Sequence, residues 1–149
     1  MNSIEKFLKD KIQPIGEQFL PATESEVAQA EREIGTRFPE LFRQLQLSYG
    51  RLVFTGETLI HAAPGIEPQT VFTIFGCKGD VGNLVTDLKL HPDLRQKGLI
   101  PFADDMFNNR YVFSSQMGDI SFVDYTQGKL QSMAKSFEDF LAKLQVIPD

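Results

Sequence analysis

The sequence has little of what metal sites and redox sites need. It contains one cysteine, two histidines and no tryptophan in 149 residues. The single cysteine, Cys77, excludes an internal disulfide and a cysteine-based metal cluster, and it agrees with a reducing compartment. His61 and His91 lie far apart and lack the spacing of a helical metal pair, so we expect no metal site.

Long apolar runs and an excess of basic residues are also missing. The longest apolar runs are only a few residues, so none can span a bilayer, and the start "MNSIEKFLKDKI" lacks the continuous apolar stretch of a secretory signal. The formal net charge is −5, without a basic tail or stripe. We therefore expect a cytoplasmic protein that binds neither nucleic acid nor membrane directly, with an acidic surface suited to a basic partner.

Motifs for nucleophilic or nucleotide chemistry are absent as well. No serine lies in a G-x-S-x-G elbow, and no phosphate loop ends in Lys-Ser or Lys-Thr. The stretch "GCKGDVG" places Gly76, Gly79 and Gly82 three apart, but a nucleotide cradle needs a strand, the glycines and a helix in a particular order. We interpret this stretch as a plain loop and expect no cofactor.

The length indicates one domain, and the types of acidic residue indicate that its two halves differ in secondary structure. A chain of 149 residues is the size of a single domain, which we place at residues 1–149. Nine of the ten acidic residues in positions 1–75 are Glu, and nine of the ten in positions 76–149 are Asp. Because Glu tolerates helix interiors and Asp prefers caps and turns, the first half should contain helices, and the second half strands and turns.

Three helices are expected in the first third of the chain. A short amphipathic helix spans residues 3–12, and a second begins at a capping box of Thr23 and Glu26 and ends at Gly35. A third follows over residues 39–50. Their inward positions are Ile4, Phe7, Leu8, Ile12, Val27, Ala30, Ile34, Phe42, Leu45 and Tyr49.

The pattern changes to strands from residue 52 onward. Residues 52–62 predict two short strands about Gly56, and residues 69–76 predict a third. The residue pattern over positions 76–92 is neither clearly helical nor clearly strand-like, and either a short helix or a long loop fits it. Four further strands joined by turns, "GLIPFA", "RYVFSS", "DISFVDY" and "KLQSMA", predict an antiparallel meander.

A last helix is expected after the meander, with Ser136 as its N-cap and Phe137, Phe140, Leu141 and Leu144 inward. This order predicts an α+β fold, in which N-terminal helices and a C-terminal helix pack on a mainly antiparallel, twisted sheet of about six strands.

The stretch "LIPFADDMFNNRYVFSS", residues 99–115, places two adjacent carboxylates and two adjacent amides between apolar and aromatic runs. As a calcium loop it fails, because neither Asp104 nor Asp105 as first ligand brings acidic residues to the third and twelfth positions. Asp104 and Asp105 are not expected to act together as an acid/base pair, because the side chains of neighbouring residues on an extended chain point to opposite faces. Two interpretations remain: the Asp and Asn side chains bond the turn amides, or the turn is an exposed acidic contact surface.

Phe107 stands in the middle of this polar turn. It is either folded back as a plug or exposed as an interface anchor. Our candidate partner-binding residues are Asp104, Asp105, Phe107, Asn108, Asn109 and Tyr111. A rival hypothesis, a small hydrolase or sugar-binding domain, would use Asp104, Asp105, Asp119 and Asp124.

Two blocks of the sequence resemble the SUKH superfamily, the Smi/Knr-type domain. The first is "ATESEVAQAEREIGTRFPELFRQLQLSYG", a capped helix followed by a helix that ends at a glycine. The second is "LIPFADDMFNNRYVFSS" with "DISFVDY" and "MAKSFEDFLAKL", a strand, an acidic turn, two strands and a closing helix. Together they cover about half of the chain and its whole order of elements.

The resemblance implies binding rather than catalysis. Bacterial members of the superfamily are mostly immunity proteins that neutralise polymorphic toxins, eukaryotic members act as regulatory scaffolds, and no catalytic residue is shared among them. We therefore expect a non-enzymatic protein-binding domain, monomeric or homodimeric, whose partner is a basic toxin domain, with a regulatory scaffold as the alternative.

Overall fold

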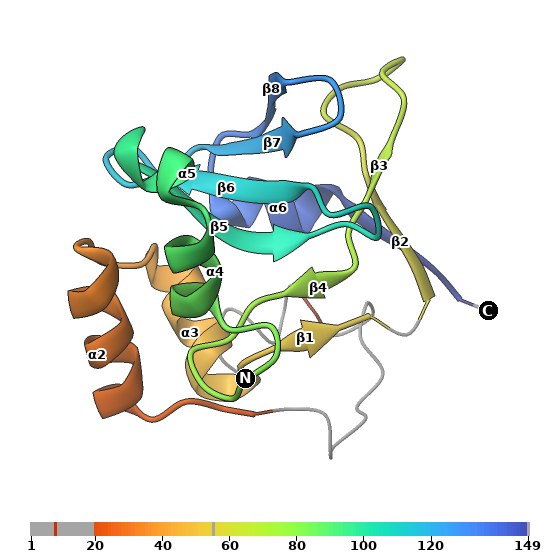
Figure 1. Cartoon of the computed structure of the whole chain (residues 1–149). Helices are drawn as coiled ribbons and strands as arrows, with labels where there is room; N and C mark the ends of the chain where they lie inside the picture. The colour runs from red at the N-terminus through yellow and green to blue at the C-terminus, as the bar shows by residue number, and fades with distance from the viewer. Residues whose placement is uncertain (1–7, 9–19, 55, 149) are drawn as a thin grey trace.

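The computed structural model describes Leu8, residues 20–54 and residues 56–148. The helix expected over residues 3–12 lies outside the described residues except for Leu8, whose side chain is buried in the core. The described part is an α+β fold with a mainly antiparallel sheet, as the sequence predicts (Figure 1). None of the helices in this part has the length and apolar character to cross a membrane.

The two described N-terminal helices follow their sequence signals. Helix α2, Glu24–Ile34, begins with the predicted capping box, in which Thr23 Oγ1 accepts from the Glu26 N–H and Glu26 Oε1 accepts from the Thr23 N–H. It ends at Gly35, whose φ of 81° lies in the left-handed region that favours glycine. Helix α3, Glu40–Ser48, is the next helix along the chain. The buried apolar side chains of both helices are Val27, Ala30, Ile34, Leu41, Phe42 and Leu45.

The main sheet has six strands in the order β1-β4-β5-β6-β7-β8, and all neighbours are antiparallel. The last four form the predicted meander, in which each strand pairs with the next one in sequence. The strands are β1 Leu52–Val53, β4 Thr73–Ile74, β5 Leu99–Asp104, β6 Arg110–Ser114, β7 Ile120–Asp124 and β8 Lys129–Ala134.

A second, three-stranded sheet was not predicted. It contains β3, Gln69–Thr70, β2, Gly56–Ile60, and β9, Leu144–Pro148, in that order. The prediction of one strand over residues 69–76 is wrong, because consecutive amides there serve different sheets. The Val71 N–H donates to the Thr58 carbonyl of β2, whereas the next amide donates to the Asp104 carbonyl of β5. The chain therefore leaves one sheet and enters the other at this point.

Residues 76–98 hold two short helices, which settles the open choice for this segment in favour of helix. Helix α4, Leu84–Leu90, is capped by Asn83, whose side chain accepts from the Thr86 N–H at 3.1 Å. Helix α5, Pro92–Gln96, starts with proline in its first turn. Both lie in front of the main sheet in Figure 1, whereas α6, Phe137–Lys143, lies behind it.

Phenylalanine rings fill the space behind the sheet. Phe102 of β5 is fully buried, and its ring centroid lies between 5.2 and 5.9 Å from four other phenylalanine rings. Those rings come from α3, β6 and α6, so one side chain joins two helices to the sheet. They are Phe42, Phe113, Phe137 and Phe140.

Candidate functional site

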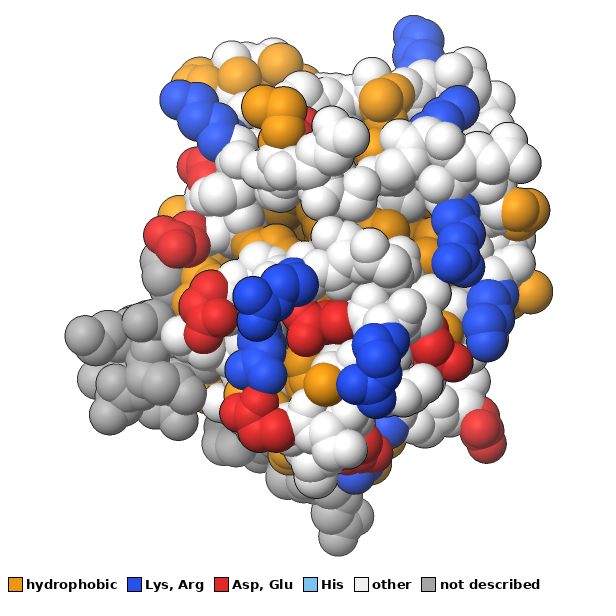
Figure 2. Space-filling model, turned by 90° about the vertical axis from the view of Figure 1, so that its left-hand side faces the viewer, with side chains coloured by type: hydrophobic (Ala, Val, Ile, Leu, Met, Phe, Trp, Pro, Cys, Tyr) orange, Lys and Arg blue, Asp and Glu red, His pale blue; other side chains and the backbone are white. Residues whose placement is uncertain are grey.

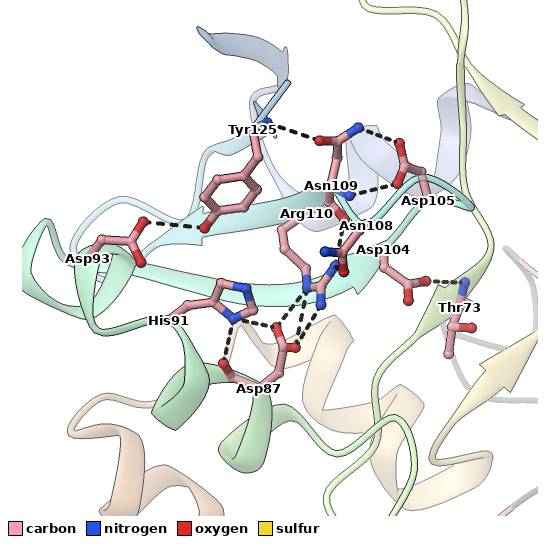
Figure 3. A network of polar contacts seen from close by, with 10 residues as sticks. All are labelled: Thr73, Asp87, His91, Asp93, Asp104, Asp105, Asn108, Asn109, Arg110 and Tyr125. Carbon is pink, nitrogen blue, oxygen red and sulfur yellow. Dashed lines mark hydrogen bonds and ion pairs between the residues drawn. The ribbon is translucent and has the colours of Figure 1, made fainter. Parts of the chain in front are cut away.

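The turn between β5 and β6 is organised by the carboxylate of Asp105. Asp105 Oδ1 accepts hydrogen bonds from the backbone N–H groups of Phe107, at 2.9 Å, and Asn109, at 2.8 Å. Asp105 Oδ2 accepts from Asn109 Nδ2, and Asn109 Oδ1 accepts from the Tyr125 N–H, which ties the turn to the end of β7 (Figure 3). The prediction that Asp and Asn side chains bond the turn amides is confirmed.

Three of the six candidate contact residues are buried. Asp105, Asn109 and Tyr111 expose 5%, 7% and 0% of their surface. The Tyr111 hydroxyl donates to the Thr70 carbonyl at 2.6 Å, and burial holds the pKa of Tyr111 well above its usual range. These side chains support the turn and the sheet beneath it, and little of their surface is exposed.

The tip of the turn is exposed. Phe107 exposes 71% of its surface, and the adjacent Met106 exposes 68%. Asn108 is also exposed and has a φ of 67°, a left-handed conformation that Asn adopts more readily than most residues. Of the two alternatives for Phe107, the structure shows the exposed one.

Asp104 ends β5 and joins the turn to the neighbouring strand. Its Oδ1 accepts from the Thr73 N–H of β4 at 3.0 Å, and its carbonyl accepts from the Phe72 N–H at 2.9 Å. Burial raises the pKa of Asp104 to about 6, against the opposing effects of the Thr73 N–H and the Arg110 guanidinium. The carboxyl is therefore a group that changes its charge near neutral pH.

A buried ion pair connects α4 with β6. Arg110 Nε lies 3.0 Å from Asp87 Oδ2, and Arg110 Nη2 donates to Asp87 Oδ1 at 3.1 Å. Arg110 Nη1 donates to the Asn109 carbonyl at 3.0 Å and contacts Asn108 Oδ1 at 3.4 Å. The guanidinium thus has partners on all three nitrogens, and both residues of the pair are only 9% exposed.

Sequence reasoning missed this pair, although both residues carried a signal. Arg110 lies two positions before the buried Val112 on β6, so its side chain is on the same face of the sheet. Asp87 lies within α4 between Leu84 and Leu88, which are both buried. Charged residues of opposite sign at two inward positions are an indication of a buried pair.

His91 and Tyr125 extend the polar network to α5. His91 Nδ1 lies 2.8 Å from the Asp87 carbonyl oxygen, and the His91 and Tyr125 ring centroids are 5.7 Å apart. The Tyr125 hydroxyl donates to Asp93 Oδ2 at 3.3 Å, and burial raises the pKa of Tyr125 to about 12 (Figure 3). His91 lies between α4 and α5, as the C-cap of the first helix and the N-cap of the second.

A pocket of about 400 Å³ opens between α4, the loop before it and the ends of β4 and β5. The Asp87–Arg110 pair and the Asp104 carboxyl form part of its wall, and exposed apolar side chains stand at its rim. The lining residues are Arg51, Val53, Phe72, Thr73, Phe75, Asp80, Val81, Gly82, Asn83, Thr86, Asp87, Leu90, Asp104 and Arg110.

Comparison with known protein families matches residues 21–143 to the SMI1 / KNR4 family (SUKH-1). The match covers most of the chain, including the turn, the ion pair and the pocket. The chain belongs to the SMI1 / KNR4 family (SUKH-1). A comparison with curated proteins gives no match.

In this SMI1 / KNR4 family chain the four carboxylates of the hydrolase hypothesis do not share a cleft. Asp105 uses both oxygens inside the turn, and Asp124 Oδ1 accepts from the Gln127 N–H of the next turn. Asp119 precedes β7, at the end of the sheet opposite to the 105–109 turn. Asp104 alone of the four lines the pocket. The arrangement does not provide the facing carboxylates that glycoside hydrolysis requires.

The three spaced glycines have a packing role. A Cβ atom at Gly82 would lie 2.7 Å from Arg51 Cδ, and one at Gly76 would lie 2.8 Å from the Arg51 backbone nitrogen. Gly79 and Gly82 also have φ values of 87° and 63°. The loop therefore needs glycine so that Arg51 can pass beneath it, in agreement with the prediction of a plain loop.

No group of three or more His, Cys, Asp or Glu residues able to hold a metal ion is found within the described ranges. Cys77 is partly buried, and desolvation raises the pKa of its thiol to about 12, so it is not an activated thiolate.

The charges on the side of the molecule that carries α2 and α4 are mixed. In Figure 2, basic and acidic side chains alternate over the lower half of this face, so neither sign dominates there. Among the described residues, four ion pairs involve acidic residues of α2: Glu24 with Arg43, Glu31 with Arg43 at 4.0 Å, Glu26 with Lys78 at 3.6 Å, and Glu33 with Lys89 at 4.0 Å.

Proposed function

We propose that this chain is a non-enzymatic, cytoplasmic immunity protein that neutralises a toxin by binding it directly. The observation that carries the proposal is the family match over residues 21–143, because bacterial SUKH domains are mostly immunity proteins. A regulatory scaffold differs from this function only in the identity of its partner. The separated carboxylates give no support to a hydrolase.

The exposed tip of the 105–109 turn is our proposed contact surface. Phe107 and Met106 are large apolar side chains exposed on a turn in which the buried Asp105 carboxylate binds two backbone amides. A rigid, exposed aromatic residue makes a good interface anchor, because little conformational entropy is lost when it enters a partner's pocket. Asn108 and Asp104 flank this anchor, whereas Asn109 and Tyr111 support it from below.

The test is protection against the toxin encoded by a neighbouring gene. The neighbouring gene's product is expressed in a bacterial host with and without this chain, and growth and complex formation are measured. We expect growth arrest without the chain, restored growth with it, and a stable complex on gel filtration. A neighbouring product that is harmless alone, or that kills equally in the presence of the chain, would contradict the proposal.

Two matched variants locate the contact. Phe107→Ala should weaken the complex at least about tenfold, as loss of an interface anchor does. Met117→Ala is the control, because Met117 is 81% exposed but lies in the turn between β6 and β7, at the other end of the sheet. Equal affinity of both variants and the wild type would exclude the 105–109 turn as the contact surface without excluding immunity itself.

A further inference from the structure

We propose that the pocket between α4 and β5 binds an arginine side chain of the partner protein. The inference rests on the proposed function in one respect, that the ligand belongs to a protein. It adds the chemistry of the contact, which follows from the charges and the walls of the pocket.

Two of the five charged side chains that line the pocket, Asp87 and Arg110, form an ion pair with each other. Every nitrogen of the Arg110 guanidinium donates to Asp87 or to the turn at Asn108 and Asn109. Asp87 Oδ1 and Oδ2 both accept from Arg110. A charge that is matched and hydrogen-bonded in this way has little capacity left for a ligand.

The remaining charges are two carboxylates and one guanidinium. Among the described residues, Asp104 makes no ion pair, and its one hydrogen-bonded side-chain oxygen is Oδ1, which accepts from the Thr73 N–H. Asp80, at the exposed rim, likewise makes no ion pair within the described ranges. Arg51 donates to the Val81 carbonyl at 3.3 Å and packs its side chain against Gly82. The Nε of Arg51 is buried without a hydrogen-bond partner among the described residues. With both carboxylates ionised, these three groups carry one more negative charge than positive charge, which favours a cation over an anion.

The partial burial of Asp104 strengthens the attraction of its carboxylate for a cation. A carboxylate that has lost part of its water gains more from an entering cation than an exposed one does, because the surrounding dielectric is lower. The acidic residues of α2, by contrast, already face Arg43, Lys78 and Lys89. Asp104 and Asp80 differ from these acidic residues in having no such basic neighbour among the described ion pairs.

The apolar rim favours arginine among the possible cations. Phe72, Val81 and Leu90 line the pocket and expose 46%, 70% and 72% of their surface. Aliphatic walls suit the stem of a long basic side chain. A guanidinium stacks on an aromatic ring such as that of Phe72 and pairs with a carboxylate in two-point geometry, whereas an ammonium does not combine both contacts.

The test uses small probes that need no toxin. Backbone amide signals of the full chain are followed by ¹H–¹⁵N NMR during titration with N-acetyl-L-arginine amide. Its neutral near-isostere, N-acetyl-L-citrulline amide, and inorganic phosphate serve as comparison probes. We expect saturable shifts at Thr73, Gly82 and Asn83 with the arginine probe only, and affinity about tenfold weaker in Asp104→Asn.

Matched variants make the test specific. Asp119→Asn, which removes the same charge at the opposite end of the sheet, should bind the arginine probe as the wild type does. Asp80→Asn at the exposed rim should weaken binding less than Asp104→Asn, and it replaces that variant if Asp104→Asn does not fold. Equal shifts with citrulline, shifts at these amides with phosphate, or no saturable shift would overturn the inference. None of these results would change the outcome of the toxin-protection experiment. Failure of the arginine-binding inference can therefore be distinguished from failure of the proposed immunity function.

Discussion

The two faces of the main sheet are held by different kinds of interaction. Behind the sheet, the ring of Phe102 packs among four other phenylalanine rings. In front of it, the Asp87–Arg110 pair and its hydrogen bonds join α4 to β6. The first interaction is non-directional and roughly proportional to area, whereas the second depends on exact partners and geometry.

This difference indicates what each face contributes. Burial of large apolar rings is a main source of folding free energy. The attraction within a buried ion pair is offset by the free energy needed to remove both charges from water. Such a pair therefore often contributes little net stability. Here the pair supports one wall of the pocket and, through Asn108 and Asn109, the exposed turn. We infer that the rear face stabilises the fold and the front face positions the binding surface.

Removing a ring from the rear face should have the largest effect. Phe102→Ala should lower the free energy of unfolding by about 3–5 kcal/mol, because it leaves a cavity among rings that cannot all move inward. Urea unfolding followed by circular dichroism measures the change. Phe107→Ala is the control, with an expected change within about 0.5 kcal/mol because Phe107 is 71% exposed. A loss below about 1 kcal/mol for Phe102→Ala would contradict this view of the rear face.

Breaking the ion pair on the front face should have the next largest effect. Asp87→Leu leaves the Arg110 guanidinium buried without its counter-charge, and we expect a loss of about 3 kcal/mol in the same unfolding experiment. The double variant Asp87→Leu/Arg110→Met removes both charges and should recover more than half of that loss. No such recovery is possible for Phe102→Ala, which distinguishes the two faces. If the double variant is as unstable as Asp87→Leu, the pair is not the self-contained unit that we infer.

Local signals were sufficient to predict several of the helices and strands. The capping box of α2, the turns that separate β5 to β8 and the Ser136 cap of α6 each lie within a few residues and need no distant partner. The hydrogen bonds of Asp105 were likewise predictable, because an Asp side chain often bonds amides two to four residues ahead.

The second sheet and the pocket were not predictable in this way. Strand β9 pairs with β2, and these two strands are far apart in the sequence. The split between β3 and β4 depends on two acceptors, the Thr58 and Asp104 carbonyls, that lie in separate sheets. The pocket similarly combines side chains from the loops and strands around Arg51, Asp87 and Arg110. Their meeting is a property of the tertiary fold, and no short pattern encodes it.

Weakening the hydrogen bonds of the 105–109 turn tests whether this turn is a separate unit of the front face. Asp105→Asn keeps an oxygen for the Phe107 and Asn109 amides but places an NH₂ group against Asn109 Nδ2, which also donates. We expect a loss of about 1–2 kcal/mol, typical of a buried donor left without an acceptor. Hydrogen exchange at the Phe107 and Asn109 amides should accelerate while exchange in α6 does not. Uniform acceleration would show that the turn is not a separate unit of the front face.

The smallest effect should come from the titration of Asp104. Burial raises its pKa from 3.8 to about 6, so the folded state holds the proton more tightly than the unfolded state does. The stability that follows from this is fully present below the unfolded pKa and is lost as the pH rises through about 6. Asp104→Asn remains neutral, and it should therefore be more stable than the wild type above pH 6. After screening by solvent at this half-exposed group, we expect about 1 kcal/mol or less.

Measuring wild type and variant at two pH values isolates this single group. The difference in unfolding free energy between Asp104→Asn and the wild type should be positive at about pH 7.5 and should vanish at about pH 3, below the ordinary pKa of Asp of about 3.9. The groups that face Asp104 are Arg110, Asp105 and Asp87, and all three are unchanged in the variant. A variant that is less stable than the wild type at both pH values would mean that the Asp104 carboxylate is a structural acceptor. Asp104 would then belong with the fixed ion pair rather than with the binding surface.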